Sequence, residues 1–225
     1  MAYHIDTGLI KEKFKLDTEC PLCDIRAVCE EQFLHEFLND AVMEEGFRGK
    51  VNKLGFCAKH FDMMFARQNK LSLALQVSSR MTTMMDKLVA VDNPKQATKV
   101  ANAIDDFGKT CIICKLTDES MEKYYITIAE MYKREPSFRE LLKNSQGFCL
   151  EHYAKLLRYS RHAGSMQKEY LSVLSELQTK HLTRIRVDLK FFCDAHDYRN
   201  ARMPLGPAES ALPRTRIKLY GKKNK

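Results

Sequence analysis

A six-residue motif, Gly-Phe-Cys-x-x-His, occurs twice in this chain of 225 residues, as GFCAKH at 55–60 and as GFCLEH at 147–152. A Cys-x-x-Cys step precedes each copy, CPLC at 20–23 and CIIC at 111–114. The two Cys-x-x-Cys steps are 91 positions apart and the two later motifs are 92 positions apart, so the spacings differ by one residue. The sequence therefore predicts an internal duplication in which each repeat carries three cysteines and a histidine.

Both four-residue steps suit metal ligands. Cys-x-x-Cys forms a tight turn that directs two sulfurs to one point, and Cys-x-x-His on the first turn of a helix places both side chains on one face. The dipole at a helix N-terminus also favours thiolates. Three sulfurs and one nitrogen are a familiar tetrahedral set for zinc, with all four positions taken by the protein.

We predict two zinc ions, one for each repeat, and pair the motifs in the order in which they occur. The first predicted site is Cys20, Cys23, Cys57 and His60, and the second is Cys111, Cys114, Cys149 and His152. The alternative cofactor is an iron–sulfur cluster, because cysteine-rich sets also hold such clusters. A helix of about 20 residues would run about 30 Å away from the Cys-x-x-Cys turn. Closure of each site therefore requires that the following residues return in a largely extended form, or that the outgoing helix is shorter or tilted.

Apolar side chains recur at three- and four-residue steps through most of the chain, which indicates helices. The predicted fold class is all-α: two duplicated helical modules, each pinned by one CxxC…CxxH metal site, in one compact bundle with an extended C-terminal tail. The predicted domains are a first module at 1–91, a connecting helix at 92–110, a second module at 111–190 and a basic, proline-containing tail at 191–225.

Two shorter stretches carry their own predictions. Asn93 is a candidate N-cap for the connecting helix, with Pro94 at its first position. The stretch MTTMM at 81–85 places Met81, Met84 and Met85 at helical spacing. We interpret these methionines as core residues, and the alternative is a methionine-rich surface for a partner.

The net charge of +8 is concentrated at the C-terminal end. Residues 197–225 carry +6, whereas the rest of the chain carries only +2. We interpret this tail as a solubility feature, and the alternative is that it contacts an acidic surface, on a nucleic acid or on a protein. No apolar run reaches the roughly 18–20 residues that a transmembrane helix needs, and the first residues lack the pattern of a signal peptide. A cytoplasmic protein is therefore expected, in which cysteines serve as metal ligands more often than as disulfides.

The sequence favours a non-enzymatic role, because closed ligand sets leave no position for a substrate and no common catalytic motif is found. The predicted function is a zinc-stabilised helical scaffold or interaction module that binds a protein or nucleic-acid partner. The alternative is an iron–sulfur or dithiol redox protein, since CPLC is similar to a glutaredoxin-type dithiol. Cys193 and His196 repeat the Cys-x-x-His step without a second Cys-x-x-Cys, so they do not predict a third metal site.

CPLC, the two GFCxxH stretches and the closing DYRN…ALPR together resemble an uncharacterised bacterial family of unknown function, over nearly the whole chain. The resemblance implies that the eight cysteines and histidines above are motif residues, and it adds Asp197, Tyr198 and Arg199 as a further motif. Some family members carry a label as ABC-transporter substrate-binding proteins, which this sequence does not support. The family brings no established activity, and an enzyme site around the Asp197 motif is a third hypothesis.

Overall fold

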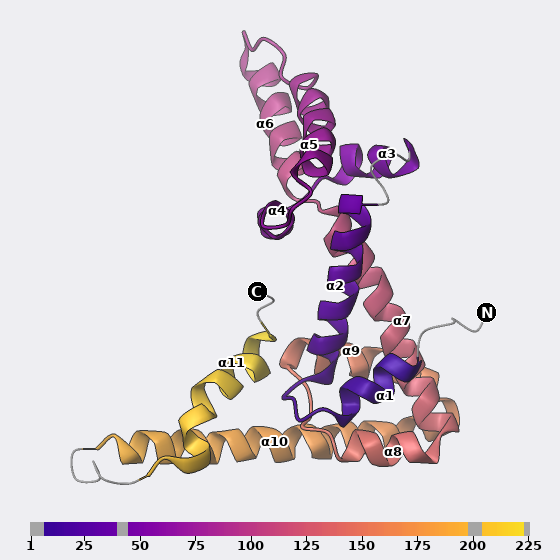
Figure 1. The fold of residues 1–225 in the computed structure, drawn as a ribbon, viewed down its shortest axis with the longest axis vertical. Coiled ribbons are helices and arrows are strands. Elements are labelled where there is room, and N and C mark those ends of the chain that lie inside the picture. Colours follow the sequence, from indigo (N-terminus) through magenta and orange to yellow (C-terminus); the bar gives the residue numbers. More distant parts are fainter. Residues whose placement is uncertain (1–6, 40–44, 198–203, 223–225) are drawn as a thin grey trace. The chain divides into compact units, whose positions relative to one another are not determined.

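The computed structural model describes residues 7–39, 45–197 and 204–222, and every regular element in these ranges is a helix (Figure 1). The predicted all-α class is therefore confirmed for the described residues. None of the helices in these ranges has the length and apolar character that crossing a membrane requires. Internal contacts divide the chain into two units, and the units do not follow the order of the sequence: unit 1 takes its described residues from 1–27 and 121–225, and unit 2 from 28–120.

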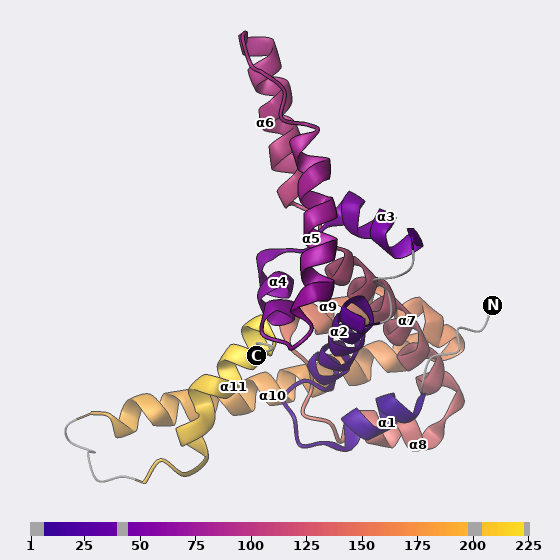
Figure 2. The same ribbon diagram turned by 45° about the horizontal axis from the view of Figure 1, so that its top comes forward.

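Unit 1 is organised around its longest helix, α10 (Gln167–Ala195). Helix α10 contacts α9 (Leu150–Arg158) and the 3-10 helix η2 (Ser160–Met166), together with the 3-10 helix η4 (Gly206–Ser210) and α11 (Ala211–Tyr220) (Figure 2). A further contact joins α1 (Thr7–Lys15) to α8 (Pro136–Lys143). The ring of Phe14 on α1 packs against those of Phe138 and Phe148, with centroids 5.3 and 6.0 Å away. These aromatic contacts bury the apolar side of α1.

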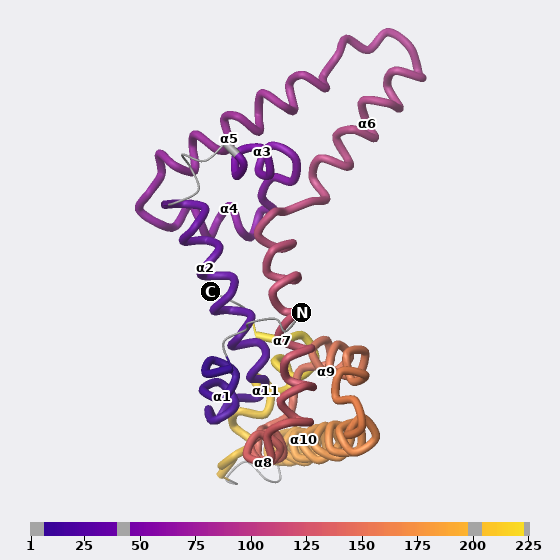
Figure 3. Tube along the Cα trace, turned by 90° about the vertical axis from the view of Figure 1, so that its right-hand side faces the viewer, coloured from indigo at the N-terminus to yellow at the C-terminus, as the bar shows by residue number. Residues whose placement is uncertain are grey.

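Unit 2 contains α3 (Glu45–Leu54), α4 (Ala58–Phe65), α5 (Lys70–Met85) and α6 (Pro94–Gly108). Its core is a cluster of aliphatic and aromatic side chains that includes Leu34, Phe37, Val51, Met64, Leu73 and Ile113. Helix α5 packs against α3 and α4, and α5 and α6 form the two arms of a hairpin (Figure 3). Helices α2 (Pro21–Asn39) and α7 (Ile112–Arg134) each begin in one unit and end in the other.

The predicted connecting helix is α6, and its start follows the predicted capping pattern. The Asn93 side chain accepts a hydrogen bond of 2.9 Å from the Gln96 backbone N–H, and Pro94 occupies the first turn. The Gln96 side chain accepts in return from the backbone N–H of Asp92, 3.2 Å away. These two bonds satisfy backbone donors on either side of the helix start, as a capping box does.

The prediction of an extended C-terminal tail is wrong for the described part of that segment. Helix α10 continues to Ala195, and η4 and α11 occupy residues 206–220. Two of the three prolines that suggested an extended chain lie in the first turns of these helices, Pro207 in η4 and Pro213 in α11, and Pro204 precedes them. Proline is compatible with a first turn, because the N–H that it lacks would have no partner within the helix.

The interpretation of the methionine-rich stretch as core is also wrong for Met81 and Met85, whereas Met84 is half-buried. Met81 and Met85 are 62% and 63% exposed. The buried face of α5 consists instead of Ser72, Leu73, Gln76 and Arg80. Helical spacing shows that these side chains share one face of the helix. It does not show whether that face is buried or exposed to solvent.

Candidate metal centres

The eight predicted ligands come together in two groups of four. The group in unit 1 is Cys20, Cys23, Cys149 and His152, and the group in unit 2 is Cys57, His60, Cys111 and Cys114. Within each group the four ligand atoms lie within 4.8 Å of one another. The predicted pairing of the motifs in sequence order is therefore wrong, because each Cys-x-x-Cys step meets the Cys-x-x-His step of the other repeat.

The lengths of the helices explain this exchange. Helix α2 starts at the first Cys-x-x-Cys step, and its 19 residues span roughly 28 Å. The in-order pairing needed an extended return to the start of α2, but ten of the residues that would make that return form α3 instead. The chain thus reaches Cys57 inside unit 2, and α7 brings it from Cys111 and Cys114 back to unit 1.

The two Cys-x-x-His steps have the same local geometry. Cys57 is the N-cap of α4, with φ −73° and ψ 162°, and Cys149 is the N-cap of α9, with φ −70° and ψ 159°. His60 and His152 follow in the first turn of the same helices. The sulfur and the ring nitrogen of each step therefore meet on one side of a helix N-terminus, as predicted.

A glycine in the left-handed region precedes each step, with φ 64° at Gly55 and φ 79° at Gly147. A side chain at either position would be strained, and it would also meet a neighbour. An added Cβ would lie 2.8 Å from Arg80 Nε at Gly55 and 3.3 Å from Gln178 Oε1 at Gly147. The glycine of the GFCxxH motif is thus required by the backbone and by close approach.

The ligand atoms of unit 1 are spaced as the corners of a small tetrahedron. His152 Nδ1 lies 3.3 Å from the sulfur of Cys149, 3.4 Å from that of Cys20 and 3.5 Å from that of Cys23. The sulfurs of Cys23 and Cys149 are 3.8 Å apart. Tetrahedral zinc with ordinary bond lengths has S···S edges of about 3.8 Å and S···N edges of about 3.6 Å. The residues of this group therefore fit a single metal ion.

The group in unit 2 has nearly the same dimensions. His60 Nδ1 lies 3.2 Å from the sulfur of Cys57, 3.3 Å from that of Cys111 and 3.4 Å from that of Cys114. The sulfurs of Cys57 and Cys114 are 3.9 Å apart. Both groups could hold a metal ion in the same way.

The electrostatics of both groups also suit a cation. In unit 1, burial raises the pKa of Cys20 well above its ordinary value, whereas interactions with the sulfurs of Cys20 and Cys23 hold the pKa of Cys149 well below it. Burial acts to lower the pKa of His152, but its hydrogen bonds to Cys149 and Cys23 outweigh that effect and raise the pKa to about 9. Three sulfurs so close together cannot all ionise unless a positive charge lies among them. A divalent metal ion would supply that charge.

The same pattern occurs in unit 2. Hydrogen bonding to Cys114 lowers the pKa of Cys111 to about 3 despite its burial, and the pKa of Cys114 is raised in turn. Burial acts to lower the pKa of His60, but hydrogen bonds to Cys111 and Glu30 raise it to about 9. One cysteine pKa in each group is thus lowered and another raised.

The two groups differ in what surrounds them. In unit 1 all four residues are buried, whereas Cys57 and Cys114 in unit 2 are half-buried. Glu30, which is 2% exposed, lies 2.8 Å from His60 Nε2 through its Oε1 and also pairs with Lys59. A carboxylate on the second nitrogen of a metal-binding histidine fixes the tautomer and the orientation of the ring. Sequence reasoning missed Glu30, which lies in a charged helical stretch and has no motif spacing to either step.

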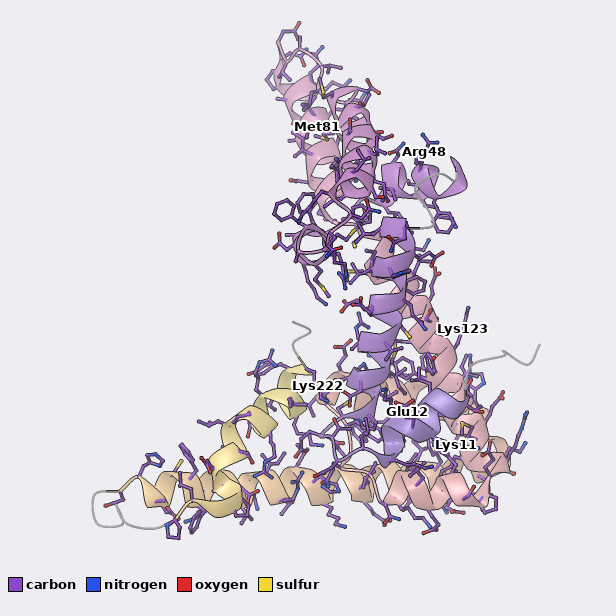
Figure 4. The ribbon with its side chains drawn as sticks, viewed as in Figure 1. Lys11, Glu12, Arg48, Met81, Lys123 and Lys222 are labelled. Carbon is purple, nitrogen blue, oxygen red and sulfur yellow. The ribbon has the colours of Figure 1, made fainter. Side chains whose placement is uncertain are left out.

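Helix α11 and the residues just after it contact the segments that carry the unit 1 cysteines. Lys218 is 1% exposed and donates hydrogen bonds to the backbone carbonyls of Glu19, at 2.6 Å, and of Gln146. Just beyond the helix, the backbone N–H of Lys222 points to the sulfur of Cys23 at 3.4 Å. Figure 4 shows Lys222 at the end of α11. The sequence placed these lysines in a basic tail, and nothing in their spacing indicated a role at a metal site.

The remaining candidate residues do not join either group. Cys193 is exposed, and His196 Nδ1 lies 2.7 Å from the backbone carbonyl of Phe192. Neither belongs to a metal-binding group among the described residues. Asp197 is the last residue of the described range 45–197, and the predicted motif residues Tyr198 and Arg199 lie outside the described residues.

Comparison with known families gives a match over the whole chain. The model of a family of unknown function, DUF6062, matches residues 1–225. The chain belongs to DUF6062. This assignment confirms the resemblance to a family of unknown function that the CPLC and GFCxxH motifs indicated. No curated protein and no solved structure matches this DUF6062 chain. The DUF6062 assignment brings no activity with it, so function is argued below from the two metal-binding groups.

Proposed function

We propose that the chain is a helical scaffold that is held together by two structural zinc ions and that binds a protein partner in the cytoplasm. The observation that carries the structural-zinc part of this proposal is the closed ligand set of each unit. Four protein atoms surround one point at tetrahedral spacing, so no coordination position remains for water or a substrate. A metal ion held in this way stabilises structure and does not act as a Lewis acid on a substrate.

The spacing of the ligand atoms supports zinc over an iron–sulfur cluster. All four atoms of each group lie within 4.8 Å of one another, which suits one metal ion. In a cluster, several irons and sulfides lie between the cysteine sulfurs and hold them farther apart. A dithiol redox role has less support, because each Cys-x-x-Cys step shares its group with a third sulfur and a histidine.

The two ions would stabilise the fold by joining distant parts of the chain. The sulfurs of Cys23 and Cys149 are 126 positions apart in sequence, and those of Cys57 and Cys114 are 57 apart. Structural zinc contributes about 10–16 kcal/mol of apparent binding free energy, which becomes folding free energy when the site does not exist in the unfolded chain. Each unit therefore depends on its own ion.

The ion pairs of the C-terminal segment favour a protein partner over a nucleic acid. Arg214 pairs with Asp188 at 2.7 Å, Lys218 with Glu19 at 3.1 Å, and Lys222 with Asp24. These described cations of the predicted basic tail are thus engaged within unit 1. Cations that are already paired attract phosphates weakly.

Elemental analysis tests the metal. Protein purified anaerobically without chelators should contain two zinc ions per chain and show no visible absorption. A brown protein with stoichiometric iron would contradict the zinc assignment.

The nucleic-acid alternative is tested by titrating labelled single- and double-stranded DNA and RNA at low salt. Binding that weakens steeply as salt increases would contradict the preference for a protein partner.

A further inference from the structure

The two candidate metal groups have the same dimensions but differ in how well their sulfurs are covered. The sulfurs of Cys23 and Cys149 in unit 1 are 3.8 Å apart, and those of Cys57 and Cys114 in unit 2 are 3.9 Å apart. Cys23 and Cys149 are 6% and 0% exposed, whereas Cys57 and Cys114 are both half-buried. A difference in reactivity between the two pairs therefore has to come from access and not from spacing.

In unit 1, the chain just after α11 covers the two sulfurs. An added Cβ at Gly221 would lie 3.6 Å from the Cys23 sulfur and 3.9 Å from the Cys149 sulfur, so the backbone of Gly221 passes close to both. The backbone N–H of Lys222 points to the Cys23 sulfur at 3.4 Å. The main chain thus shields this pair from solvent.

In unit 2, Cys57 instead lines a cavity of about 370 Å³. The walls of this cavity include Ala58, Phe61 and Gly108, which are all exposed, so the cavity is open to solvent and admits a molecule as small as hydrogen peroxide. Oxidation of a cysteine requires both access and a thiolate, and a cysteine that binds a metal ion is a thiolate. Cys57 meets both conditions when its group holds zinc.

The unit 2 group offers Cys57 two sulfurs as partners, and their surroundings differ. Cys111 is 8% exposed, and the backbone N–H groups of Cys57 and Cys114 hydrogen-bond its sulfur. Bonds of this kind stabilise the charge of a thiolate and make it a weaker nucleophile. Cys114 is half-buried like Cys57, and its sulfur is already close to that of Cys57. Cys114 is therefore the better partner.

We propose that Cys57 and Cys114 form an oxidisable pair, through which hydrogen peroxide opens the unit 2 metal site and leaves the unit 1 site intact. This inference rests on the zinc sites of the proposed function. The Cys57 thiolate attacks one peroxide oxygen, the O–O bond breaks, hydroxide leaves, and Cys57 becomes a sulfenic acid. The Cys114 thiolate then attacks the Cys57 sulfur, so that an S–S bond forms and the S–O bond breaks with loss of a second hydroxide. The two sulfurs lose one electron each, the peroxide gains both, and two protons from solvent convert the hydroxides into water.

The disulfide removes two of the four ligands of the unit 2 group, because its sulfurs no longer carry the thiolate charge that binds zinc. It joins one sulfur from each step, so this chemistry differs from that of a Cys-x-x-Cys dithiol. A structural zinc ion contributes to the folding free energy of its own unit. Unit 2 therefore loses stability on oxidation, while unit 1 keeps its ion.

Peroxide treatment of the full-length, zinc-loaded protein tests this inference. A Cys193→Ser background removes an exposed thiol that would otherwise react. A chromophoric chelator follows zinc release, and mass spectrometry of proteolytic peptides locates the disulfide. One zinc ion per chain should leave roughly tenfold faster than the other, with a disulfide between Cys57 and Cys114 as the product. Two ions that leave at the same rate, or release without that disulfide, would overturn the inference.

Ala58→Leu tests the route through the cavity. Ala58 lines the cavity next to Cys57, so a larger side chain should narrow the approach to the sulfur and slow release of the first ion severalfold, with zinc content unchanged. Ala101→Leu, the same change at an exposed position of α6 outside the cavity lining, is the control and should leave the rate unchanged. A wild-type rate in the Ala58→Leu variant would refute this route.

Zinc content before oxidation separates this inference from the proposed function. Fewer than two zinc ions per chain would contradict the structural zinc sites, and the oxidisable site would fall with them. Two ions that leave together would contradict only the oxidisable site, because both zinc sites would then be present and equally accessible.

Discussion

At the scale of single residues, the second ring nitrogens of the two ligand histidines have different environments. His60 Nε2 faces the carboxylate of Glu30, whereas His152 Nε2 is buried and has no hydrogen-bond partner among the described residues. The unit 2 site therefore gains orientation from a side chain, while the unit 1 site depends on packing. The glycine before each Cys-x-x-His step could be predicted from the motif alone. The carboxylate could not, because it comes from another helix.

Replacing Glu30 by glutamine should weaken zinc binding in unit 2 by about 10- to 100-fold, because the neutral amide holds the imidazole less firmly and lowers its basicity. Competition with a chromophoric chelator measures this change. Glu31→Gln is the matched control, since Glu31 is adjacent, exposed and paired with Arg67 instead of with a ligand. Equal zinc affinity in the Glu30→Gln variant and the wild type would show that the carboxylate does not support the site.

At the scale of elements, α11 fastens the two ligand turns of unit 1 to each other. Its Lys218 ammonium reaches the carbonyl of Glu19, directly before Cys20, and that of Gln146, directly before the GFCxxH motif. Burial lowers the pKa of this lysine, while the Glu19 carboxylate acts to raise it and so favours the charged form. This helix, where the sequence predicts an extended basic tail, is therefore part of the structure around the candidate metal site.

Lys218→Met should destabilise unit 1 by about 3–5 kcal/mol, because it removes a buried charge that pairs with Glu19 and leaves two carbonyls without their donor. Urea denaturation at saturating zinc measures the loss, and zinc release from unit 1 should become faster. Lys180→Met, at an exposed position of α10, is the control and should change the midpoint little. A wild-type midpoint in the Lys218→Met variant would mean that α11 does not hold the site together.

At the scale of the whole molecule, the order of the motifs in sequence differs from their order in space. Helices α2 and α7 start at the two Cys-x-x-Cys steps, and each carries the chain from one unit into the other. Each unit therefore contains a Cys-x-x-Cys step from one repeat and a Cys-x-x-His step from the other. Neither half of the sequence alone supplies the four residues of a candidate metal site, so both halves contribute to each group.

Zinc stoichiometry in paired variants tests this exchange. The Cys20→Ser/Cys149→Ser double variant removes two ligands from one group, so it should retain one zinc ion per chain. The Cys20→Ser/Cys57→Ser variant damages both groups and should retain none. Pairing of the motifs in sequence order would give the opposite result, which makes the two variants controls for each other.

The sequence by itself determined the candidate ligand residues and their local geometry. Residues three apart on a helical turn meet on one face whatever the rest of the chain does, so the two steps were readable from spacing. The helical class followed from periodicity in the same way. These features depend on interactions between residues that are close in sequence.

Only the tertiary structure decided which ligands share a site, which lysine is buried and which face of α5 stays exposed. The pairing of Cys-x-x-Cys with Cys-x-x-His steps depends on where α2 and α7 end, because these helices determine which steps lie close together. The burial of Lys218 depends on the fit of α11 between two distant turns. The exposure of Met81 and Met85 depends on what packs against α5, which a periodic pattern does not specify. Each of these outcomes is set by contacts between segments far apart in sequence, which local patterns do not encode.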